Sequence, residues 1–211
     1  VFLMELGDFQ DRAFDGQSFN VINAGNLKNQ GFELDGDWAP MSWLALYASV
    51  GYLDAEFDKY PNASCLPYPA QVDPTCTQNL AGERPVFAPE WQGSTGAEVT
   101  GDLGPVGYSL RADLSYMDDI NVNQINDNNP QGIQDAYTLL SARFSLFFGA
   151  ERKIALTLWG DNLTDEEYCT ATVAQPFDNL LGLRDPVSGG TVMRCQVNVP
   201  RTYGVSLKAS F

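Results

Sequence analysis

The sequence lacks one of the residue types on which catalytic sites most often depend. The chain has 211 residues and no His, which excludes a Ser-His-Asp or Cys-His catalytic pairing and a His-bearing metal site. Adjacent carboxylates such as Glu166 and Glu167 are too common a pattern to indicate acid–base catalysis. We therefore expect a protein that is not an enzyme and that needs no metal and no cofactor.

The four cysteines fall into two pairs, Cys65 with Cys76 and Cys169 with Cys195, each in a polar stretch rich in Pro, Asn and Asp. They lack CxxC spacing, which argues against a zinc ribbon. An even number of cysteines in surface loops is typical of disulfides formed in an oxidising compartment. We expect both disulfides, and four free thiols are the alternative.

The composition narrows the class of protein. The net charge of −15 argues against nucleic acid as a partner, because phosphates require a basic surface. Charged residues make up 18% of the chain and aromatic residues 12%. No apolar run approaches the length of a membrane helix. The first ten residues do not resemble a signal peptide but read as the middle of a strand, so we expect the chain to begin inside a longer protein.

Alternation of apolar and polar residues predicts strands, because successive side chains of a strand point to opposite faces. In the segment from Tyr203 to Phe211, for example, the odd-numbered positions are apolar and most even-numbered positions are polar. Charged residues stay on one face of each predicted strand. The eight expected strands are 1–10, 18–38, 43–57, 86–100, 106–119, 136–148, 153–162 and 201–211.

The connections between these strands alternate strictly between long and short. In an up-and-down meander every second connection lies at the same end, so all short turns gather at one end and all long loops at the other. Outer-membrane barrels have this asymmetry, an apolar outer face and a polar lumen. The expected short connections are 39–42, 101–105 and 149–152, and the expected long ones are 11–17, 58–85, 120–135 and 163–200.

The pattern therefore predicts an all-β, antiparallel up-and-down transmembrane β-barrel. Membrane barrels carry aromatic girdles at both interfaces. Tyr108 and Tyr116 stand at the two ends of one apolar row, and Tyr203 and Phe211 lie in the last strand. We expect these four residues in the girdles, with Phe211 at the periplasmic side.

Several stretches, taken in order, resemble the C-terminal portion of a TonB-dependent outer-membrane receptor, over essentially the whole chain. They are NAGNLKNQGFELDGDWAP, LALYASVGYLDAEFDKYPNA, RPVFAPEWQGSTGAEV, LWGDNLTDEEY and PRTYGVSLKASF. The NLTDEEY block and the final stretch are the most specific. The resemblance implies a plugged barrel of about 22 strands, of which residues 1–211 supply the last eight. The plug domain and the segment that engages TonB lie outside this stretch.

The resemblance also implies function, location and partners. The whole protein would import a scarce nutrient, of the siderophore, cobalamin or saccharide class, across the cell outer membrane with energy from TonB. Its long loops would be extracellular. The implied partners are outer-membrane lipid and lipopolysaccharide, the protein's own plug, TonB, the nutrient and, as an open possibility, a surface lipoprotein.

Side chains in the long loops and the upper lumen are the candidate ligand contacts. The amide-rich stretch 121–135 suits polar ligands, and Arg143 suits an anionic one, although solvated loops and pairing of the arginines with Asp113, Glu98 or the plug are the simpler interpretations. Asp127 with its neighbouring asparagines offers oxygen ligands for Ca²⁺, but the spacing does not match an EF-hand. The ligand-binding candidates are Tyr60, Tyr68, Gln124, Asn126, Asn128 and Arg143.

In the NLTDEEY block, Asn162, Asp165 and Glu166 favour a turn that ends the preceding strand, because such side chains hydrogen-bond nearby backbone.

Two other architectures remain open. Eight strands are enough to close a small outer-membrane barrel with a structural or adhesion role. A secreted β-sandwich binding module, joined by two disulfides, is the second alternative.

Overall fold

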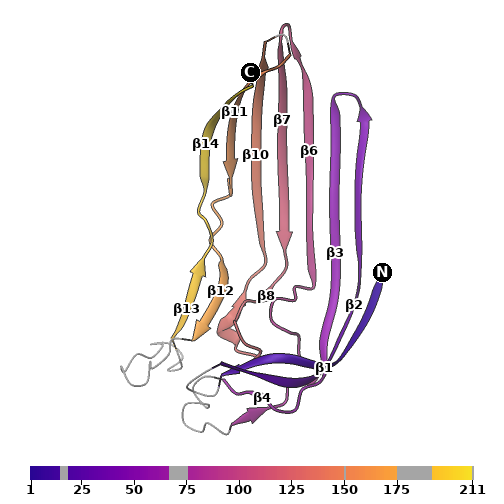
Figure 1. The fold of residues 1–211 in the computed structure, drawn as a ribbon, viewed down its shortest axis with the longest axis vertical. Helices are drawn as coiled ribbons and strands as arrows, with labels where there is room; N and C mark the ends of the chain where they lie inside the picture. Colours follow the sequence, from indigo (N-terminus) through magenta and orange to yellow (C-terminus); the bar gives the residue numbers. More distant parts are fainter. Residues whose placement is uncertain (15–18, 67–75, 150, 175–191, 211) are drawn as a thin grey trace.

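The computed structural model describes residues 1–14, 19–66, 76–149, 151–174 and 192–210. All eight expected strands are present and form one antiparallel sheet in the order β1-β2-β3-β6-β7-β10-β11-β14 (Figure 1). Each strand therefore pairs with its neighbours along the chain, apart from short elements in the loops. The sheet strands are β1 (Phe2–Phe14), β2 (Phe19–Met41), β3 (Leu44–Lys59), β6 (Trp91–Leu103), β7 (Val106–Met117), β10 (Tyr137–Phe148), β11 (Ile154–Asp161) and β14 (Thr202–Ala209).

The connections are sorted by length, as the sequence predicts. The links β2–β3, β6–β7 and β10–β11 are short and lie at one end of the sheet, which we call the turn end (Figure 1). Gly104 in the β6–β7 turn has φ +64° and Gly149 after β10 has φ +86°, a region that glycine adopts at little cost. The opposite end, which holds the longer connections, is the loop end.

The first connection differs from the expectation. The segment 11–17 was expected as a long loop, but β1 runs to Phe14 and β2 begins at Phe19, with pairing continued to that last register. Backbone pairing thus extends through a polar sequence that gives little strand signal. The other long connections contain short elements: β4 (Ala63–Ser64) with β5 (Thr77–Gln78), β8 (Ile120–Asn121), η1 (Pro130–Gly132), β9 (Ile133–Gln134), and β12 (Cys169–Ala174) with β13 (Met193–Val197).

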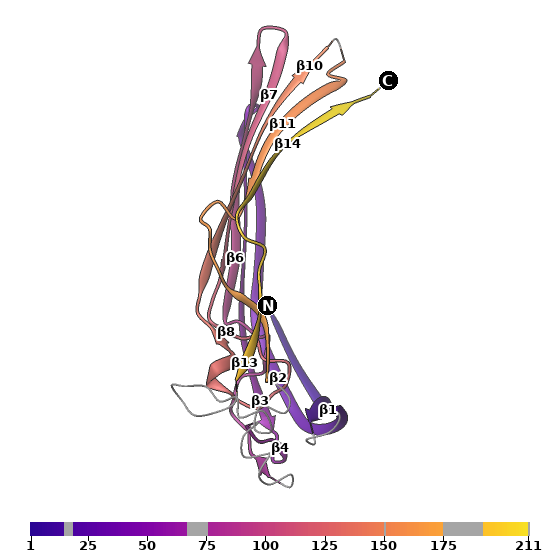
Figure 2. The ribbon, with the colours of Figure 1, turned by 90° about the vertical axis from the view of Figure 1, so that its left-hand side faces the viewer.

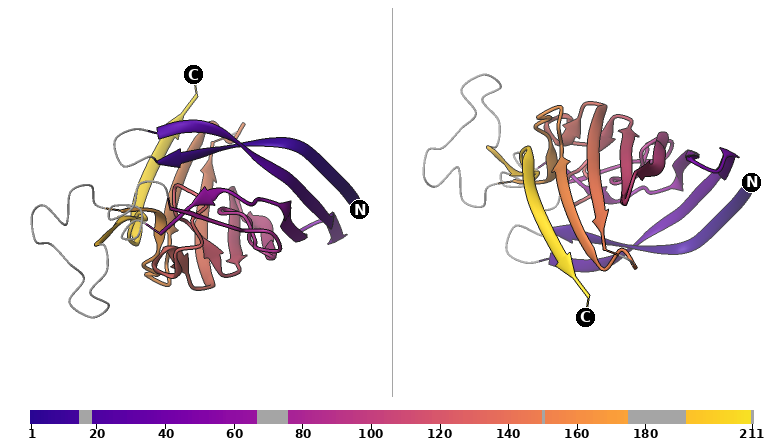
Figure 3. Two further views of the ribbon diagram at one scale, coloured as in Figure 1. Left: turned by 90° about the horizontal axis from the view of Figure 1, so that it is seen from below. Right: turned by 90° about the horizontal axis from the view of Figure 1, so that it is seen from above.

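The sheet is curved along and across its strands (Figures 2 and 3). Within the described residues β1 and β14 are its two edges and do not pair with each other. The strands therefore do not close into an eight-stranded barrel, which argues against the small-barrel alternative. Among the described residues no helix is long and apolar enough to span a membrane.

Register places the apolar side chains of neighbouring strands on one side of the sheet, which we call the apolar face. Directly opposite residues share a face, and one line of partners runs through six strands: Leu44, Val99, Leu110, Phe144, Leu158 and Val205. Many of these side chains are exposed, and Leu207 is 72% exposed. A face this apolar and this exposed requires an apolar environment.

The buried core is small and lies at the loop end. It consists of Ala24, Leu27, Phe57, Tyr60, Ala63 and Leu80, with Phe9 and Ile22 against it. The rings of Phe57 and Tyr60 meet edge to face with centroids 4.9 Å apart. The side chains of β1, β2 and β3 thus bury apolar surface against the loop that follows β3, while the middle of the sheet has no second layer.

The block NLTDEEY forms the expected turn. Asn162 donates from Nδ2 to the Glu166 carbonyl and accepts from the Glu166 amide, both at 2.9 Å. Asp165 forms an ion pair with Arg201 at 3.2 Å, which ties the turn to the residue before β14. The prediction of a structural role for these residues is confirmed.

Candidate functional site

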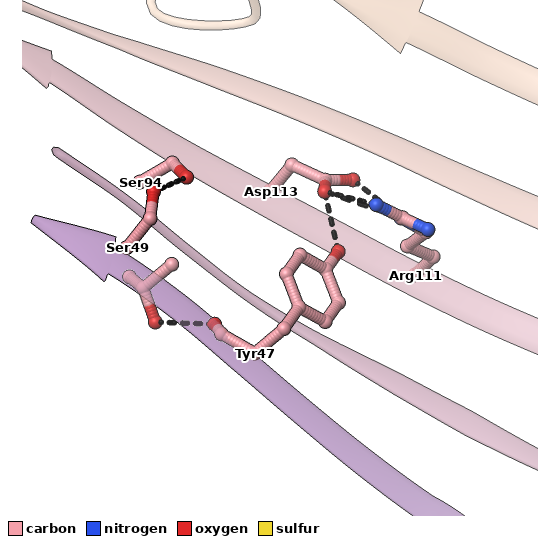
Figure 4. Close-up of polar contacts among 6 residues, drawn as sticks. Tyr47, Ser49, Ser94, Arg111 and Asp113 are labelled. Atoms are coloured by element: carbon pink, nitrogen blue, oxygen red, sulfur yellow. Dashed lines mark hydrogen bonds and ion pairs between the residues drawn. The ribbon is translucent and has the colours of Figure 1, made fainter. Parts of the chain in front are cut away.

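The polar face, opposite the apolar face, carries a connected group of charged and aromatic side chains in the middle of the sheet. Arg111 on β7 donates to Asp113 from Nε and Nη2 at 2.8–3.1 Å. Tyr47 on β3 donates its hydroxyl to the same carboxylate (Figure 4). The Arg111 guanidinium lies 4.5 Å from the centroid of the Tyr47 ring, a cation–π distance. The expected pairing of Arg111 with Asp113 is confirmed.

Arg143 lies directly opposite Arg111, on β10. Its side chain has no hydrogen-bond or ion-pair partner among the described residues, and the residue is exposed. Like charges in opposite register repel each other, so Asp113 offsets only part of the positive charge here. The arrangement leaves one guanidinium available to a group that occupies the space in front of this face.

Hydroxyl and aromatic groups complete the polar face. Ser49 and Ser94 are hydrogen-bonded across β3 and β6 at 2.8 Å (Figure 4), and Ser145 and Thr157 across β10 and β11 at 2.9 Å. Trp159 donates from Nε1 to Ser206 at 3.2 Å. These side chains give the middle of the sheet a polar, hydrogen-bonded surface.

The three loops and the β1–β2 hairpin are joined by partly buried hydrogen bonds into what we call the loop layer. Asp11 on β1 accepts from the Tyr60 hydroxyl and from Asn126 Nδ2, both at 2.9 Å. Asn126 also accepts from the Val86 amide at 2.8 Å. Burial and the neighbouring Asp11 charge raise the pKa of Tyr60 far above its ordinary value. One carboxylate thus connects segments that are far apart in the sequence.

Asp127 is the most buried charged residue of the loop layer, with 0% of its surface exposed. Its Oδ1 accepts from Asn123 Nδ2 at 2.7 Å and from the Asn129 amide at 3.1 Å. Its Oδ2 has no partner among the described residues. Burial raises the pKa of Asp127 from 3.8 to about 6, against the opposing effect of the two hydrogen bonds. The Gln78 amide links the Asp127 carbonyl to that of Ser64.

Both expected disulfides are present. Cys65–Cys76 brackets the loop after β3, and Cys169–Cys195 joins β12 to β13. Cys65 is buried, with 8% exposure, whereas Cys195 is exposed. The bridges therefore stabilise two separate parts of the loop layer.

The structure divides the ligand-binding candidates. Tyr60 and Asn126 are buried and hydrogen-bonded inside the loop layer, so neither side chain is exposed to a ligand in this structure, and their contact with a ligand stays a prediction. Gln124 and Asn128 are exposed at the loop end. Arg143 stands apart, in the middle of the sheet. Tyr68 lies outside the described residues.

The girdle candidates lie on the apolar face. Tyr116 stands at the loop end of β7 and Tyr108 at its turn end, while Tyr203 is the first apolar-face residue of β14 at its loop-side end. Phe211 lies outside the described residues. One aromatic group was not predicted from the sequence. Phe32, Tyr52 and Trp91 come together from β2, β3 and β6, with ring centroids 4.8–5.9 Å apart. Only cross-strand register reveals that these rings meet.

Metal ligands do not gather in the described part of the chain, where no three His, Cys, Asp or Glu side chains form a group. Asp127 is the carboxylate of the proposed Asp127–Asn129 calcium site. The Oδ1 atom of this carboxylate accepts hydrogen bonds from two N–H groups, which are not metal ligands.

Solved structures of receptors are among those that resemble this chain in fold. The ferric yersiniabactin uptake receptor FyuA from Yersinia pestis superposes on 99% of this chain with a TM-score of 0.70 at 18% identity. The siderophore receptor PiuA and the ferric preacinetobactin receptor BauA, both from Acinetobacter baumannii, cover 98% and 97% with TM-scores of 0.62 and 0.59, each at 16% identity. The chain spans 26%, 25% and 26% of these three structures.

A search of curated proteins finds no match. The family model described as TonB dependent receptor-like, beta-barrel matches residues 1–163. That match contains the polar-face network, β1 to β11 and the first disulfide, and the remaining residues continue the same meander. This chain therefore belongs to the TonB-dependent receptor-like β-barrel family.

Proposed function

We propose that the complete protein imports a ferric siderophore across the outer membrane, through a plugged barrel that TonB energises, without chemical catalysis of its own. The observation that carries the proposal is the meander itself: connections sorted by length, with an exposed apolar face opposite a hydroxyl- and charge-lined face. Membership of the receptor family supports the transport role. The siderophore class is supported by the three solved structures, which are named as siderophore or ferric-chelate receptors.

In this proposal the apolar face contacts lipid, the polar face lines the lumen and contacts the plug, and the loop layer is extracellular. Exposed Gln124 and Asn128 at the loop end are the contacts that we assign to the ligand. Arg143 lies deeper and faces the interior. Buried Tyr60 and Asn126 keep the loops in place.

Uptake of ⁵⁵Fe tests the proposal. Cells lacking the gene, grown without iron, are offered a panel of ferric siderophores, with labelled cobalamin and oligosaccharides in parallel. We expect the gene to restore uptake of at least one ferric siderophore, and only in cells that have TonB. Restoration of cobalamin or oligosaccharide uptake alone would contradict the siderophore class.

The ligand surface is tested by replacing Gln124 and Asn128 together with Ala. Each replacement removes an exposed amide, so affinity for the siderophore should fall by about thirtyfold if each contributes one hydrogen bond of about 1 kcal/mol. Glu151→Gln at the turn end, also exposed, is the matched control. Equal affinity of the double variant and the control would remove these residues from the ligand surface.

A further inference from the structure

Phe87, in the loop between β5 and β6, has an unusual backbone conformation for its residue type. Its φ is +58°, in the left-handed region, which is strained for a bulky side chain. Among the described residues, four of the five other non-glycine residues with a positive φ are Asp or Asn, which tolerate it best. The fifth is Arg152, in the short β10–β11 connection, where its side chain pairs with Asp102.

The surrounding structure holds Phe87 in this conformation. Its backbone amide donates to the Asn121 carbonyl at 2.8 Å, and the nearby residues Pro85, Ala88 and Pro89 are buried. A strained backbone persists only where neighbouring contacts fix it, and such residues cluster at ligand-binding and active sites. The loop is thus anchored on both sides of one strained aromatic residue.

The Phe87 side chain is not fully buried in return for this strain. It is 50% exposed, so much of its apolar surface contributes nothing to the stability of the fold. Ile133, which is 53% exposed, pairs with Asn121 in the β8–β9 ladder. Phe87 and Ile133 therefore both stand next to Asn121 and offer exposed apolar surface at the loop end.

This apolar surface is the size of a small ligand rather than of a protein partner. A large apolar side chain buries about 150–250 Å², so two half-exposed ones offer on the order of 200 Å². Each partner in a stable protein–protein interface buries about 800 Å². A small molecule with an apolar portion matches the available surface.

The long connections at the loop end are strongly acidic. The stretches 60–90, 118–136 and 162–201 together contain twelve Asp and Glu residues, four Arg and no Lys. In 118–136, the stretch that holds Ile133, all four charged residues are Asp. An excess of one sign of charge attracts ligands of the opposite sign and repels those of the same sign. The loop end therefore disfavours a highly anionic ligand.

We propose that Phe87 contacts a ferric siderophore that is neutral or positively charged and has an apolar portion, as ferric trihydroxamates are, and that the acidic loops disfavour trianionic ferric triscatecholates. This inference rests on the proposed function, because the loop layer must face the medium from which the siderophore arrives. The protein's own plug and a second copy of the protein are the alternative partners of Phe87.

Asn is the test substitution at position 87, because it removes the ring and tolerates a positive φ. Phe87→Asn should therefore lose ligand affinity without losing stability. Phe87→Tyr keeps the ring and should keep the affinity. Val197→Asn is the matched control, since Val197 is 60% exposed and lies on β13, in the β12–β13 hairpin.

The experiment is a binding titration of the full-length receptor in detergent with three probes: neutral ferrichrome, cationic ferrioxamine B and trianionic ferric enterobactin. We expect at least one of the first two to bind. Ferric enterobactin should bind about a hundredfold more weakly at low salt, and this difference should narrow as added salt screens the charges. Tighter binding of the trianion, or binding of neither of the other probes, would overturn the proposal.

The same titration tests the contact at Phe87. Phe87→Asn should bind the preferred probe about tenfold more weakly, the loss expected from half the transfer free energy of a Phe side chain. Phe87→Tyr and Val197→Asn should bind it as the wild type does. Equal affinity of Phe87→Asn and Val197→Asn would remove Phe87 from the ligand surface.

Urea unfolding of these variants separates ligand contact from a structural role. Phe87→Asn should unfold at the same urea concentration as the wild type or at a higher one, because the backbone strain is relieved. Unfolding at lower urea would show that Phe87 packs on the plug, and a dimer that Phe87→Asn disrupts would show that it packs on a second copy. Either result would overturn the proposal.

Uptake distinguishes this inference from the proposed function. If cells import only a ferric triscatecholate, the assigned charge class is wrong and siderophore import stands. If cells import no ferric siderophore, the proposed function itself fails.

Discussion

Asp113 is the carboxylate that partly offsets the positive charge of Arg111 and Arg143 on the polar face. It accepts from Arg111 and from the Tyr47 hydroxyl, while Arg143 stands opposite Arg111 in the register. The side chains of Arg111 and Asp113 are more than a third exposed, 44% and 35%, so water screens their ion pair and its contribution to stability is small.

Replacing Asp113 with Asn should lower the free energy of unfolding of the full-length barrel by about 1 kcal/mol, because two opposed arginines lose their shared counter-charge. Adding Arg143→Met should restore most of that loss. Urea unfolding of the single and double variants in detergent measures both values, with Ser141→Ala as control. If Arg143→Met restores nothing, the two arginines do not interact.

Asp127 makes the loop layer sensitive to pH. Burial raises its pKa from 3.8 to about 6, so the folded state binds the proton more tightly than the unfolded state. The stabilising effect of protonation is fully present below about pH 4 and is lost as pH rises through about 6. We expect amide exchange in residues 118–136, corrected for its intrinsic pH dependence, to increase across that window.

Asp127→Asn should remove this pH dependence and keep exchange slow at pH 7, because the amide oxygen still accepts from Asn123 and Asn129 without a buried charge. Asp119→Asn is the control, since the Asp119 side chain is 58% exposed. An unchanged pH profile in Asp127→Asn would show that another group controls the loop.

At the level of elements, the loops owe their order to cross-links as much as to apolar burial. Cys65 is buried, whereas Cys195 in the β12–β13 hairpin is exposed. A mild reductant should therefore open Cys169–Cys195 first. Mass mapping of alkylated peptides over time would measure the order, and simultaneous reduction would contradict it.

Removing Cys65–Cys76 by replacing both residues with Ser should destabilise the loop layer by about 3 kcal/mol through the unfolded state. The strands β6, β7 and β10 should keep their protection, because their pairing with one another does not involve this loop, whereas the loop end of β3 is bonded to it at Gly82 and Glu83. Limited proteolysis of the full-length receptor would distinguish a local effect, with cleavage near 60–85, from cleavage throughout the barrel.

At the level of the whole molecule, β1 and β14 leave two unpaired edges on a curved sheet. Unpaired edges promote association, so residues 1–211 alone should aggregate in detergent, whereas the full-length receptor should run as a compact, heat-modifiable barrel. A stable monomer of the isolated chain with protected edges would revive the eight-stranded alternative.

The fold was largely predictable because a strand displays its two faces directly in the sequence. In the stretch 106–117 each second residue is apolar, and register then needs only the turns to bring such rows together. Residues 11–14 were expected in a loop but belong to β1, because polar residues can pair through their backbone when a neighbouring strand is present. The candidate site was less predictable: Tyr60 and Tyr116 are both aromatic residues next to loops, yet one is 1% exposed and the other 42%.

The sequence by itself determined the strands, the sorting of the connections, the absence of His and the two cysteine pairs, because these depend on residue type and local period. Only the tertiary structure decided which side chains from distant strands and loops lie next to each other. It placed Arg143 opposite Arg111, buried Asn126 on Asp11, and held the exposed Phe87 at a positive φ. The physical reason is that burial and pairing depend on which distant strand lies alongside, and this information is not contained in any local stretch of residues.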